Sequence, residues 1–235
     1  MKALVIGGSG GIGSALVEHL VARSDVVEVI ATHFTSAPSL THEKLSWHAL
    51  NASDEASVKS LFEQLPALDM LLIASGFLHD NARKPEKTIK QFQPDTLNHC
   101  ISSNVQPTLL AAKYAAPLLK ASKRSVFASI SARVGSIEEN QLGGWYSYRI
   151  SKASLNMALR TLSVEWQRSL PRCTVAALHP GTTDTPLSSP FQKNVPAEKL
   201  FSPELSAQYL MAVIDGLHPG LSGRFWSWDG TELAW

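Results

Sequence analysis

Residues 5–20 have the sequence VIGGSGGIGSALVEHL, in which five of seven consecutive positions are glycine. The glycines lie between an apolar run and an amphipathic pattern, which predicts a loop that joins a strand to a helix. Glycine permits positive φ angles, and its missing Cβ lets a phosphate approach the N-terminus of the helix. A P-loop would end in Gly-Lys-Ser/Thr, whereas Ser14 and Ala15 follow Gly13 here. The stretch therefore predicts a glycine loop of the dinucleotide-binding type.

Two glycine spacings fit this loop equally well. Gly8, Gly10 and Gly13 match G-x-G-x-x-G, whereas Gly7, Gly11 and Gly13 match G-x-x-x-G-x-G. Each spacing places different glycines against the phosphates, so the choice between them depends on the rest of the chain.

Short apolar runs alternate with helical patterns along the chain. Strands are expected at residues 3–7, 26–31, 69–75, 125–131, 174–180 and 223–230. Helices are expected at residues 14–24, 53–65 and 202–217, with further helices between the later strands. This alternation predicts an α/β fold of Rossmann type: a doubly wound, mostly parallel sheet with helices on both faces, in three α/β/α layers. No linker or repeat divides the chain, and we expect one domain over residues 1–235.

Composition and charge argue against several classes of protein. The 235 residues carry a net charge of +1, which offers no field for gripping nucleic acid. No segment approaches the roughly 18 apolar residues of a membrane span, and the opening MKALVIGG lacks the features of a signal peptide. Cys100 and Cys173 are isolated, and the histidines have no metal-ligand spacing. We therefore expect a cytoplasmic protein with no nucleic-acid partner, no membrane partner and no metal.

A second stretch, GGWYSYRISKASLNMALR (143–160), contains a tyrosine and a lysine on one face of a predicted helix. Tyr148 and Lys152 are four residues apart, whereas Tyr146 lies about 240° around the helix from Lys152. A nearby ammonium favours the phenolate, so we expect Lys152 to lower the pKa of Tyr148 from its usual value of about 10. Tyr148 would then serve as a proton donor and acceptor. The alternative is an ordinary structural pair, because this spacing is common in helices.

Taken together, the two stretches resemble the short-chain dehydrogenase/reductase family, which is marked by G-x-x-x-G-x-G and Y-x-x-x-K. SNVQPTLL (103–110) and HPGTTDT (179–185) resemble two further segments of the family. SARVGSI, GGWYSYRISKASLN and the late WDG are most similar to carbonyl reductase-like and C-factor-like members. The resemblance implies hydride transfer between a nicotinamide cofactor and a carbonyl or alcohol substrate.

The resemblance selects one of the two glycine spacings. It implies that Gly7, Gly11 and Gly13 are constrained and that Gly8 and Gly10 tolerate a side chain. Gly7 would turn the chain out of the strand, Gly11 would allow the approach of phosphate, and Gly13 would allow helix packing.

Catalytic roles follow from the same resemblance. Tyr148 would be the general acid/base on the substrate oxygen, and Lys152 would hold the nicotinamide ribose and lower the pKa of Tyr148. Asn104 would hold a water in a proton relay to Lys152. The structural alternative for Asn104, which is compatible with the relay, is a helix-kink residue bonded to backbone.

The family serine that holds the carbonyl oxygen has no clear counterpart. Counting back three residues from Gly135 leads to Ala132, with Ser131 directly before it and Ser136 twelve residues before Tyr148. We favour Ser131 because it ends the strand, although neighbouring strand residues point to opposite faces. Ser136 is the alternative, and the third option is that neither serine acts and turnover is slow.

The end of the second predicted strand bears on the choice of cofactor. An NAD site places a carboxylate there, but residues 29–42 contain no acid. His33 and the hydroxyls of Thr32, Thr35 and Ser36 would tolerate a 2′-phosphate, although no arginine clamps it. NADP(H) is therefore favoured over NAD(H), with His33 as the contact. The alternative for His33 is a solvated loop histidine.

Other expected cofactor contacts rest on the resemblance alone. The family's N-N-A-G segment is IASG (73–76) here, and an amide replaces the aspartate that contacts adenine. Ile6 stands where the family begins the loop with threonine, which predicts the loss of one bracing hydrogen bond. The implied contacts are Ser9, the Ile12 amide, Asn51, Gly76, Pro180, Gly181, Thr183 and Thr185.

The segment 185–203 is rich in proline and apolar residues, as expected of a mobile lid over a substrate. It favours an apolar or aromatic carbonyl compound, although its apolar residues would equally suit a partner subunit. Subunit pairing in the family implies a homodimer or a homotetramer.

Three functions remain open. The first is an NADP(H)-dependent oxidoreductase for carbonyls and alcohols, which the Tyr148–Lys152 pair favours. The second is a weakly active, nucleotide-binding regulatory or signalling protein of the C-factor type, for which the displaced serine leaves room. The third is a sugar-nucleotide epimerase, which shares Y-x-x-x-K but needs a longer C-terminal substrate domain.

Overall fold

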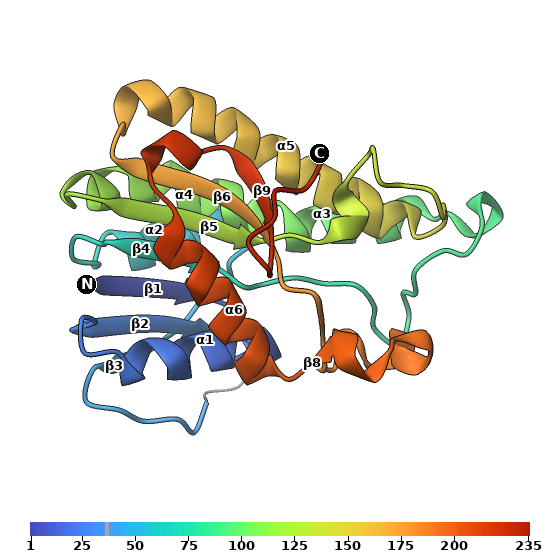
Figure 1. Ribbon diagram of the computed structural model, residues 1–235, viewed down its shortest axis with the longest axis horizontal. Coiled ribbons are helices and arrows are strands. Elements are labelled where there is room, and N and C mark those ends of the chain that lie inside the picture. The colour runs from blue at the N-terminus through green and yellow to red at the C-terminus, as the bar shows by residue number, and fades with distance from the viewer. Residues whose placement is uncertain (36–37) are drawn as a thin grey trace.

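The computed structural model describes residues 1–35 and 38–235 (Figure 1). At its centre is a sheet of seven strands in the order β3-β2-β1-β4-β5-β6-β9, and all neighbouring strands are parallel. This is the doubly wound parallel sheet that the sequence predicts. The strands are β1 (Lys2–Ile6), β2 (Glu28–His33), β3 (Leu45–Ala49), β4 (Met70–Ile73), β5 (Ser125–Ile130), β6 (Cys173–His179) and β9 (Arg224–Ser227).

The six expected strands are all present, with ends shifted by a few residues, but β3 was not predicted. Its sequence LSWHA has no continuous apolar run, because β3 is the edge strand and its side chains are half buried or exposed. Pairing with β2, and not local pattern, makes this segment a strand.

Helices cover both faces of the sheet (Figure 1). On one face, α1 (Gly11–Ala22) packs against α6 (Pro203–Gly216). On the other face lie α2 (Glu55–Phe62), α3 (Pro94–Asn104), α4 (Gln106–Lys120) and α5 (Tyr146–Ser169). The three-layer α/β/α architecture is therefore confirmed.

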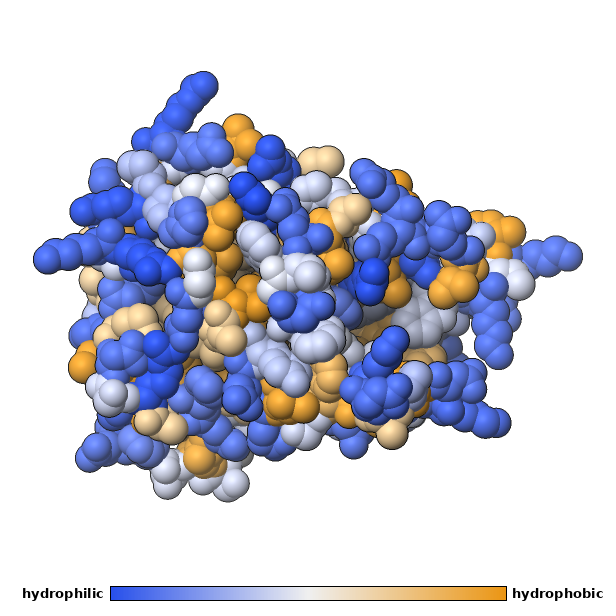
Figure 2. Space-filling view, in the orientation of Figure 1, coloured by the Kyte–Doolittle hydropathy of each residue, from blue (hydrophilic) through white to orange (hydrophobic). Residues whose placement is uncertain are grey.

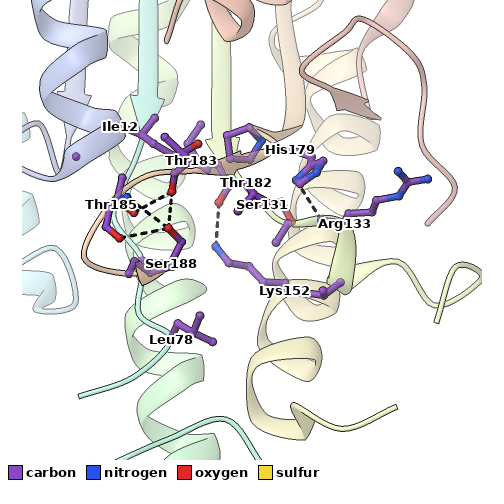
Figure 3. Close-up of a pocket in the computed structure, with 18 of the residues that line it drawn as sticks. Ile12, Leu78, Ser131, Arg133, Lys152, His179, Thr182, Thr183, Thr185 and Ser188 are labelled. Atoms are coloured by element: carbon purple, nitrogen blue, oxygen red, sulfur yellow. Dashed lines mark hydrogen bonds between the residues drawn. The ribbon is translucent and has the colours of Figure 1, made fainter. Parts of the chain in front are cut away.

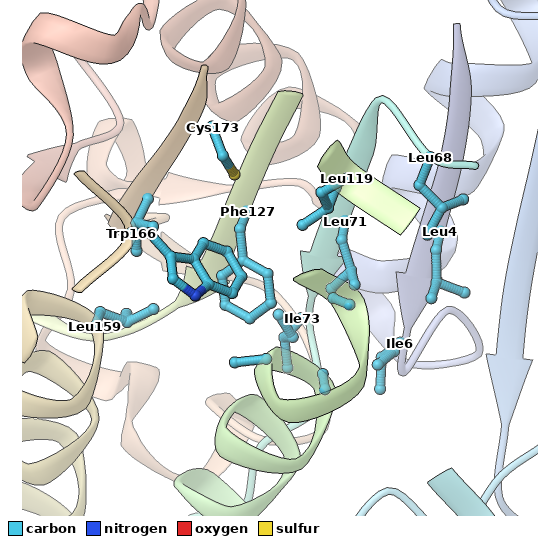
Figure 4. Close-up of a cluster of buried hydrophobic side chains, with 14 of the residues drawn as sticks. Leu4, Ile6, Leu68, Leu71, Ile73, Leu119, Phe127, Leu159, Trp166 and Cys173 are labelled. Carbon is cyan, nitrogen blue, oxygen red and sulfur yellow. The ribbon is translucent and has the colours of Figure 1, made fainter. Parts of the chain in front are cut away.

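Alternate side chains of the strands enter two separate cores, as the pleat of a strand requires. Leu4 and Ile6 join the core on the side of α2 to α5, whereas Val5 joins the core on the side of α1 and α6. In the first core the ring of Phe127 meets Trp166 edge to face, with centroids 5.3 Å apart (Figure 4). Because both faces of the sheet are buried, the inner strands are continuous apolar runs that the sequence reveals.

Capping side chains set the start of two helices. Ser202 accepts a hydrogen bond from the amide of Leu205 (3.2 Å) at the start of α6, where the sequence predicts a cap. At α2 the cap is Asp54, which accepts from the amide of Ser57 (2.8 Å), so α2 begins after the expected position 53. Helix α1 begins at Gly11, before the expected position 14, because the glycine loop itself forms the first turn.

The predicted motifs follow the carboxyl ends of β1, β4, β5 and β6, where the strand order reverses and a crevice opens. After β6 the chain forms a small parallel sheet of β7 (Thr182–Thr183) and β8 (Leu200–Phe201). The 3-10 helices are η1 (Ile89–Gln91), η2 (Arg133–Gly135), η3 (Ser189–Asn194), η4 (Ala197–Lys199) and η5 (Pro219–Leu221).

Among the described residues, no helix is both long and apolar enough to cross a membrane. Figure 2 shows one face of the molecule, on which hydrophilic side chains predominate and apolar ones lie singly or in small groups.

Candidate active site

Three positions of the glycine loop have no room for a side chain. Gly7 has a φ of +79°, and a Cβ on Gly13 would lie 2.1 Å from the carbonyl oxygen of Gly7. A Cβ on Gly11 would lie 2.5 Å from Cγ2 of Thr185. At Gly10 the nearest atom would be 3.4 Å away, which is an ordinary contact. The geometry thus agrees with the G-x-x-x-G-x-G spacing and with tolerance at Gly10.

The expectation that Gly8 tolerates a side chain is wrong. An added Cβ would lie 3.0 Å from Cβ of Ala31, 3.1 Å from the ring of Trp47 and 3.2 Å from Val17. These neighbours belong to β2, β3 and α1, so the constraint comes from tertiary packing that the loop sequence does not reveal.

Thr32 braces the glycine loop. Its Oγ1 accepts a hydrogen bond from the amide of Gly7 (3.0 Å), and the residue is buried. This bond makes up for the one expected to be lost with Ile6 at the family's threonine position. The Thr32 hydroxyl is therefore directed to the glycine loop, and its tolerance of a 2′-phosphate stays a prediction.

His33, the last residue of β2, has the features of a polar contact. Its Nδ1 is buried and has no hydrogen-bond partner among the described residues. Its ring meets Trp47 edge to face, with centroids 6.4 Å apart, so it is packed and is not a freely solvated loop histidine. Thr35 is exposed, and Ser36 lies outside the described residues. Residues 29–42 contain no acid, so this strand end has no carboxylate that would repel a 2′-phosphate.

Most of the other expected cofactor residues meet in one cavity of about 500 Å³. Asn51 is exposed outside it, where its Oδ1 accepts from the amide of Ser53 (3.2 Å), and Ser9 is also exposed outside it. Bare glycine backbone at the start of α1 and a long cavity fit a dinucleotide. The expected residues that line the cavity are Ile12, Gly76, Pro180, Gly181, Thr183 and Thr185.

The segment after β6 is held in place by contacts with Phe201 and with α6. Gly181 has a φ of +76°, and a Cβ there would lie 2.6 Å from the ring of Phe201. The hydroxyl of Thr183 is 2.6 Å from that of Ser206 on α6, so the Thr183 side chain is fastened to the helix. Contact of this segment with a cofactor in the cavity would therefore come largely from backbone and from Thr185, whose methyl group lies over Gly11.

Tyr148 and Lys152 lie on one face of α5 and are both buried. The ammonium of Lys152 is 5.8 Å from the centre of the Tyr148 ring and donates to the carbonyl of Ile130 (2.9 Å) at the end of β5 (Figure 3). Both residues line the cavity, so the helical spacing in the sequence has placed them as expected.

The expected pKa of Tyr148 is corrected by the structure. Burial raises the pKa of Tyr148 above its usual 10, because loss of solvent disfavours the phenolate. Burial also lowers the pKa of Lys152 to about 8, which weakens the positive charge near neutral pH. The sequence shows the spacing of the pair but not its degree of burial.

Asn104 ends α3, next to the junction with α4. Its Oδ1 accepts from the amide of Phe77 (2.6 Å), and its Nδ2 donates to the carbonyl of Phe77 and to Oγ of Ser151 (both 2.9 Å). A helix-break residue bonded to backbone, the structural alternative, is therefore confirmed. A Cβ on Gly76 would lie 3.4 Å from this Oδ1 and 3.7 Å from Nζ of Lys152, so both groups lie next to Gly76.

The two candidate serines have different surroundings. Ser131 lines the cavity beside Ala132, and its hydroxyl donates to Oδ1 of Asn156 on α5 (2.6 Å). Ser136 lies outside the cavity, where its hydroxyl donates to the carbonyl of Trp235 (3.2 Å). The structure thus brings Ser131, and not Ser136, to the cavity that contains Tyr148.

The cavity has apolar walls that the sequence only partly revealed. The ring of Phe191 is 4.8 Å from that of Trp145 and 5.5 Å from that of His79, so the segment 185–203 reaches across to α5. Nε2 of His79 is 3.2 Å from the carbonyl of Leu187. The apolar wall residues are Leu78, Val134, Trp145, Leu187, Phe191 and Val195.

Trp145 and His179 are cavity residues that were not singled out from the sequence. Both lie next to recognised motifs, so proximity to those motifs is the signal that could have found them. Nδ1 of His179 lies 3.4 Å from the amide of Arg133 and accepts its hydrogen bond, and burial lowers the pKa of His179 to about 4. The imidazole is therefore neutral at physiological pH.

Residues 1–196 match the family model described as short chain dehydrogenase. The chain belongs to this family. A Rhodococcus relative, 1-hydroxy-2-glutathionyl-2-methyl-3-butene dehydrogenase, is 30% identical over 238 residues, which cover 99% of this chain and 98% of that protein. C-signal of Myxococcus xanthus is 41% identical over 109 residues, a match that spans only 46% of this chain and 60% of C-signal.

Solved structures show the same short-chain dehydrogenase fold. Carbonyl reductase Sniffer of D. melanogaster has a TM-score of 0.86 at 22% identity and covers 100% of this chain and 99% of its own. NADPH-bound carbonyl reductase from chicken fatty liver has a TM-score of 0.86 at 26% identity, covering 100% and 94%. The family inferred from the motifs is therefore confirmed, and the protein is an NAD(P)-linked oxidoreductase.

Proposed function

We propose that the protein transfers hydride between NADP(H) and an apolar carbonyl or alcohol, with Tyr148 as general acid/base. One observation carries this proposal. The buried Tyr148–Lys152 pair faces the same cavity as the start of α1, where glycines leave the backbone bare. A proton-transfer group and a phosphate cradle thus lie at two ends of one space, as hydride transfer to a carbonyl requires.

The site residues account for the proton that accompanies the hydride. Bound NADPH would supply the hydride. The hydroxyl of Tyr148 would donate its proton to the carbonyl oxygen as negative charge develops there, so that the product is an alcohol. The raised pKa of Tyr148 keeps the phenol protonated, which is the form needed for reduction. Lys152, with a pKa of about 8, can return a proton to the phenolate at neutral pH, with Asn104 as the relay residue.

NADP(H) is proposed in preference to NAD(H). The backbone at Gly11 would approach the pyrophosphate at the N-terminus of α1, while Gly7 turns the chain and Gly13 allows the helix to pack. His33 supplies an unpaired nitrogen for the 2′-phosphate. Further contacts are proposed from Ser9, the Ile12 amide, Asn51, Gly76, Lys152, Pro180, Gly181, Thr183 and Thr185.

Ser131 is the proposed holder of the substrate oxygen, because it is the serine that lines the cavity. Its hydroxyl now donates to Oδ1 of Asn156, while Nδ2 of Asn156 is buried and has no partner in the part of the chain that the structure describes. A half-turn of the Asn156 amide would let Nδ2 donate to Ser131 and free the hydroxyl proton for the substrate.

The substrate proposal rests on the apolar walls around Trp145 and Phe191, which suit an aromatic or apolar carbonyl compound. We propose that residues 185–203 form a lid over this substrate within one domain that spans residues 1–235. A cytoplasmic location is proposed from the two isolated cysteines, and a homodimer or homotetramer from the family resemblance.

A second candidate function is a weakly active regulatory or signalling protein of the C-factor type. It is favoured by Ala132, which occupies the position of the family serine, and by the partial similarity to C-signal. Without a second donor, the substrate oxygen would be held by Tyr148 alone, and turnover would be slow.

Substitution of Tyr148 tests the enzyme proposal. NADPH oxidation is followed with a panel of aldehydes, ketones and quinones for the parent protein, Tyr148→Phe and the control Tyr146→Phe. Loss of the proton donor is expected to lower kcat about 1,000-fold in Tyr148→Phe while the Kd for NADPH changes little. Tyr146→Phe is expected to keep parental activity. Equal cofactor consumption by the parent and Tyr148→Phe on every substrate would refute the proposal and favour the regulatory alternative.

A further inference from the structure

Glu86 is a buried carboxylate that the proposed reaction does not use. It is 3% exposed and lies in the long segment between β4 and α3. Its carboxylate accepts hydrogen bonds from the amide of Ser147 (3.2 Å) and from the hydroxyl of Ser147. Ser147 is the second residue of α5, so the charge lies at a helix N-terminus, where free amides and the helix dipole stabilise it.

The backbone of Glu86 holds the residue that precedes α5. The carbonyl of Glu86 accepts a hydrogen bond from the amide of Trp145 (2.5 Å). Trp145 has φ 53° and ψ 38°, in the left-handed region that side-chain-bearing residues rarely adopt. The preceding Gly143 and Gly144 also have positive φ, but for glycine this conformation has no steric cost. The unusual conformation of Trp145 therefore depends on its surroundings.

The conformation of Trp145 decides the shape of the cavity. Its ring lines the cavity 4.8 Å from Phe191 and 6.1 Å from the ring of Tyr148. In a right-handed conformation the side chain would leave the backbone in another direction, and the contact with Phe191 would be lost. Side chain and backbone of one residue, Glu86, thus hold both the first turn of α5 and the aromatic wall next to it.

We infer that Glu86 is a positioning residue: it holds Trp145 in its left-handed conformation and thereby sets the selectivity of the cavity for aromatic over small aliphatic carbonyl substrates. The part of this inference that concerns substrate selectivity rests on the proposed function. The part that concerns the conformation of Trp145 does not. Glutamine at this position keeps the size of the side chain but has only one acceptor oxygen, and its amide group would face the donors of Ser147.

A spectroscopic test does not require turnover. The near-UV circular dichroism of Trp145 is obtained by subtracting the spectrum of Trp145→Phe from that of the parent, and again in the Glu86→Gln background. The Trp145 signal is expected to fall to about half or less in Glu86→Gln, because an unheld ring loses its fixed asymmetric surroundings. The control Glu63→Gln, at an exposed position at the C-terminal end of α2, is expected to leave the Trp145 signal unchanged. An unchanged Trp145 signal in Glu86→Gln would overturn the inference.

A kinetic test measures selectivity as the ratio of kcat/KM for benzaldehyde to that for propanal. Glu86→Gln is expected to lower this ratio about tenfold, mainly through KM for benzaldehyde, with the Kd for NADPH within twofold of the parent. In a Trp145→Gly background, where the left-handed turn is free of strain, Glu86→Gln is expected to have no further effect on the ratio. Equal effects with and without Trp145 would show a merely structural role and overturn the inference.

The outcomes separate this inference from the proposed function. If the parent shows no Tyr148-dependent turnover, the proposed function fails, and the dichroism of Trp145 still decides the role of Glu86. If Glu86→Gln does not fold, the same measurements on Ser147→Ala decide it, since that variant removes only the hydroxyl donor to Glu86. A smaller fall of the Trp145 signal in Ser147→Ala would support the inference, and an unchanged signal would overturn it.

Discussion

The two ends of the site differ in what limits substitution: at Gly7 and Gly13 backbone atoms leave no space for a Cβ, whereas at the α5 end polar side chains bond to groups of other segments. A Cβ on Gly13 would meet the backbone of Gly7 at 2.1 Å. The side chains of Asn104, Lys152 and Ser131 instead bond to residues that are 27, 22 and 25 positions away in the chain. Both halves use distant segments, since Thr32 and Thr185 also contact the glycine loop, but only the loop is limited by contact of backbone with backbone.

This difference predicts different tolerance to substitution. A backbone clash has no simple remedy, so the glycine loop has little freedom to vary. A side-chain network can lose one member, as the alanine at position 132 shows, while the fold is preserved. The substrate end is therefore the half in which activity can be lowered, raised or redirected.

The largest expected effect on cofactor binding is at the glycine loop. Gly13→Ala is expected to weaken NADPH binding about 100-fold or to prevent folding, because its Cβ has no space beside Gly7. Gly10→Ala, the matched control, is expected to bind within about threefold of the parent, since its Cβ makes only an ordinary contact. Fluorescence titration and thermal unfolding measure both variants. The reverse order of affinities would favour the G-x-G-x-x-G spacing instead.

A large effect on stability is expected from His179 at the substrate end. Burial lowers its pKa from 6.5 to about 4, so between these values the unfolded chain binds a proton that the folded protein does not. The free energy of unfolding therefore falls as the pH decreases from 6.5 through 4. At pH 5 this loss is expected to be about 2 kcal/mol larger in the parent protein than in His179→Asn. Urea unfolding of both proteins at pH 7 and pH 5 measures this difference. A difference that does not change with pH would contradict the burial of a neutral imidazole.

A moderate gain is expected at Ala132, which lines the cavity where the family serine would be. Ala132→Ser adds a donor for the substrate oxygen and is expected to raise kcat/KM about tenfold. Ser131→Ala is the companion variant. If Ser131→Ala lowers turnover strongly and Ala132→Ser does not raise it, Ser131 already holds the oxygen. If Ser131→Ala has no effect on kcat, the Ser131 hydroxyl bonds only to Asn156 and does not hold the substrate oxygen.

The smallest effect is expected at the edge of the cofactor half. His33→Ala removes the unpaired nitrogen at the end of β2 and is expected to weaken NADPH binding about fivefold while leaving NADH binding unchanged. His42→Ala, at an exposed position outside the site, serves as the control. Equal losses for both cofactors would reject His33 as the contact that distinguishes NADPH from NADH.

Sequence reasoning predicted the buried strands and the helical Tyr148–Lys152 pair because these features depend on local patterns. It missed β3, whose half-exposed residues become a strand only through pairing with β2. It also missed the constraint on Gly8 and the brace from Thr32, since both depend on β2 lying next to the loop. The pKa of Tyr148 was predicted in the wrong direction, because burial cannot be inferred from helical spacing.

By itself, the sequence determined the parallel α/β sheet and the helical Tyr148–Lys152 pair, because hydrophobic period and helical spacing are local properties. The family resemblance, which both motifs carry together, selected the glycines of the G-x-x-x-G-x-G spacing. Only the tertiary structure decided that Ser131 rather than Ser136 meets the cavity, that Thr32 turns to the loop and that Glu86 reaches Ser147 across 61 residues. Each of these findings concerns which distant group a side chain contacts. They depend on which distant segments the packed sheet and helices bring within hydrogen-bond distance, and no local pattern contains that information.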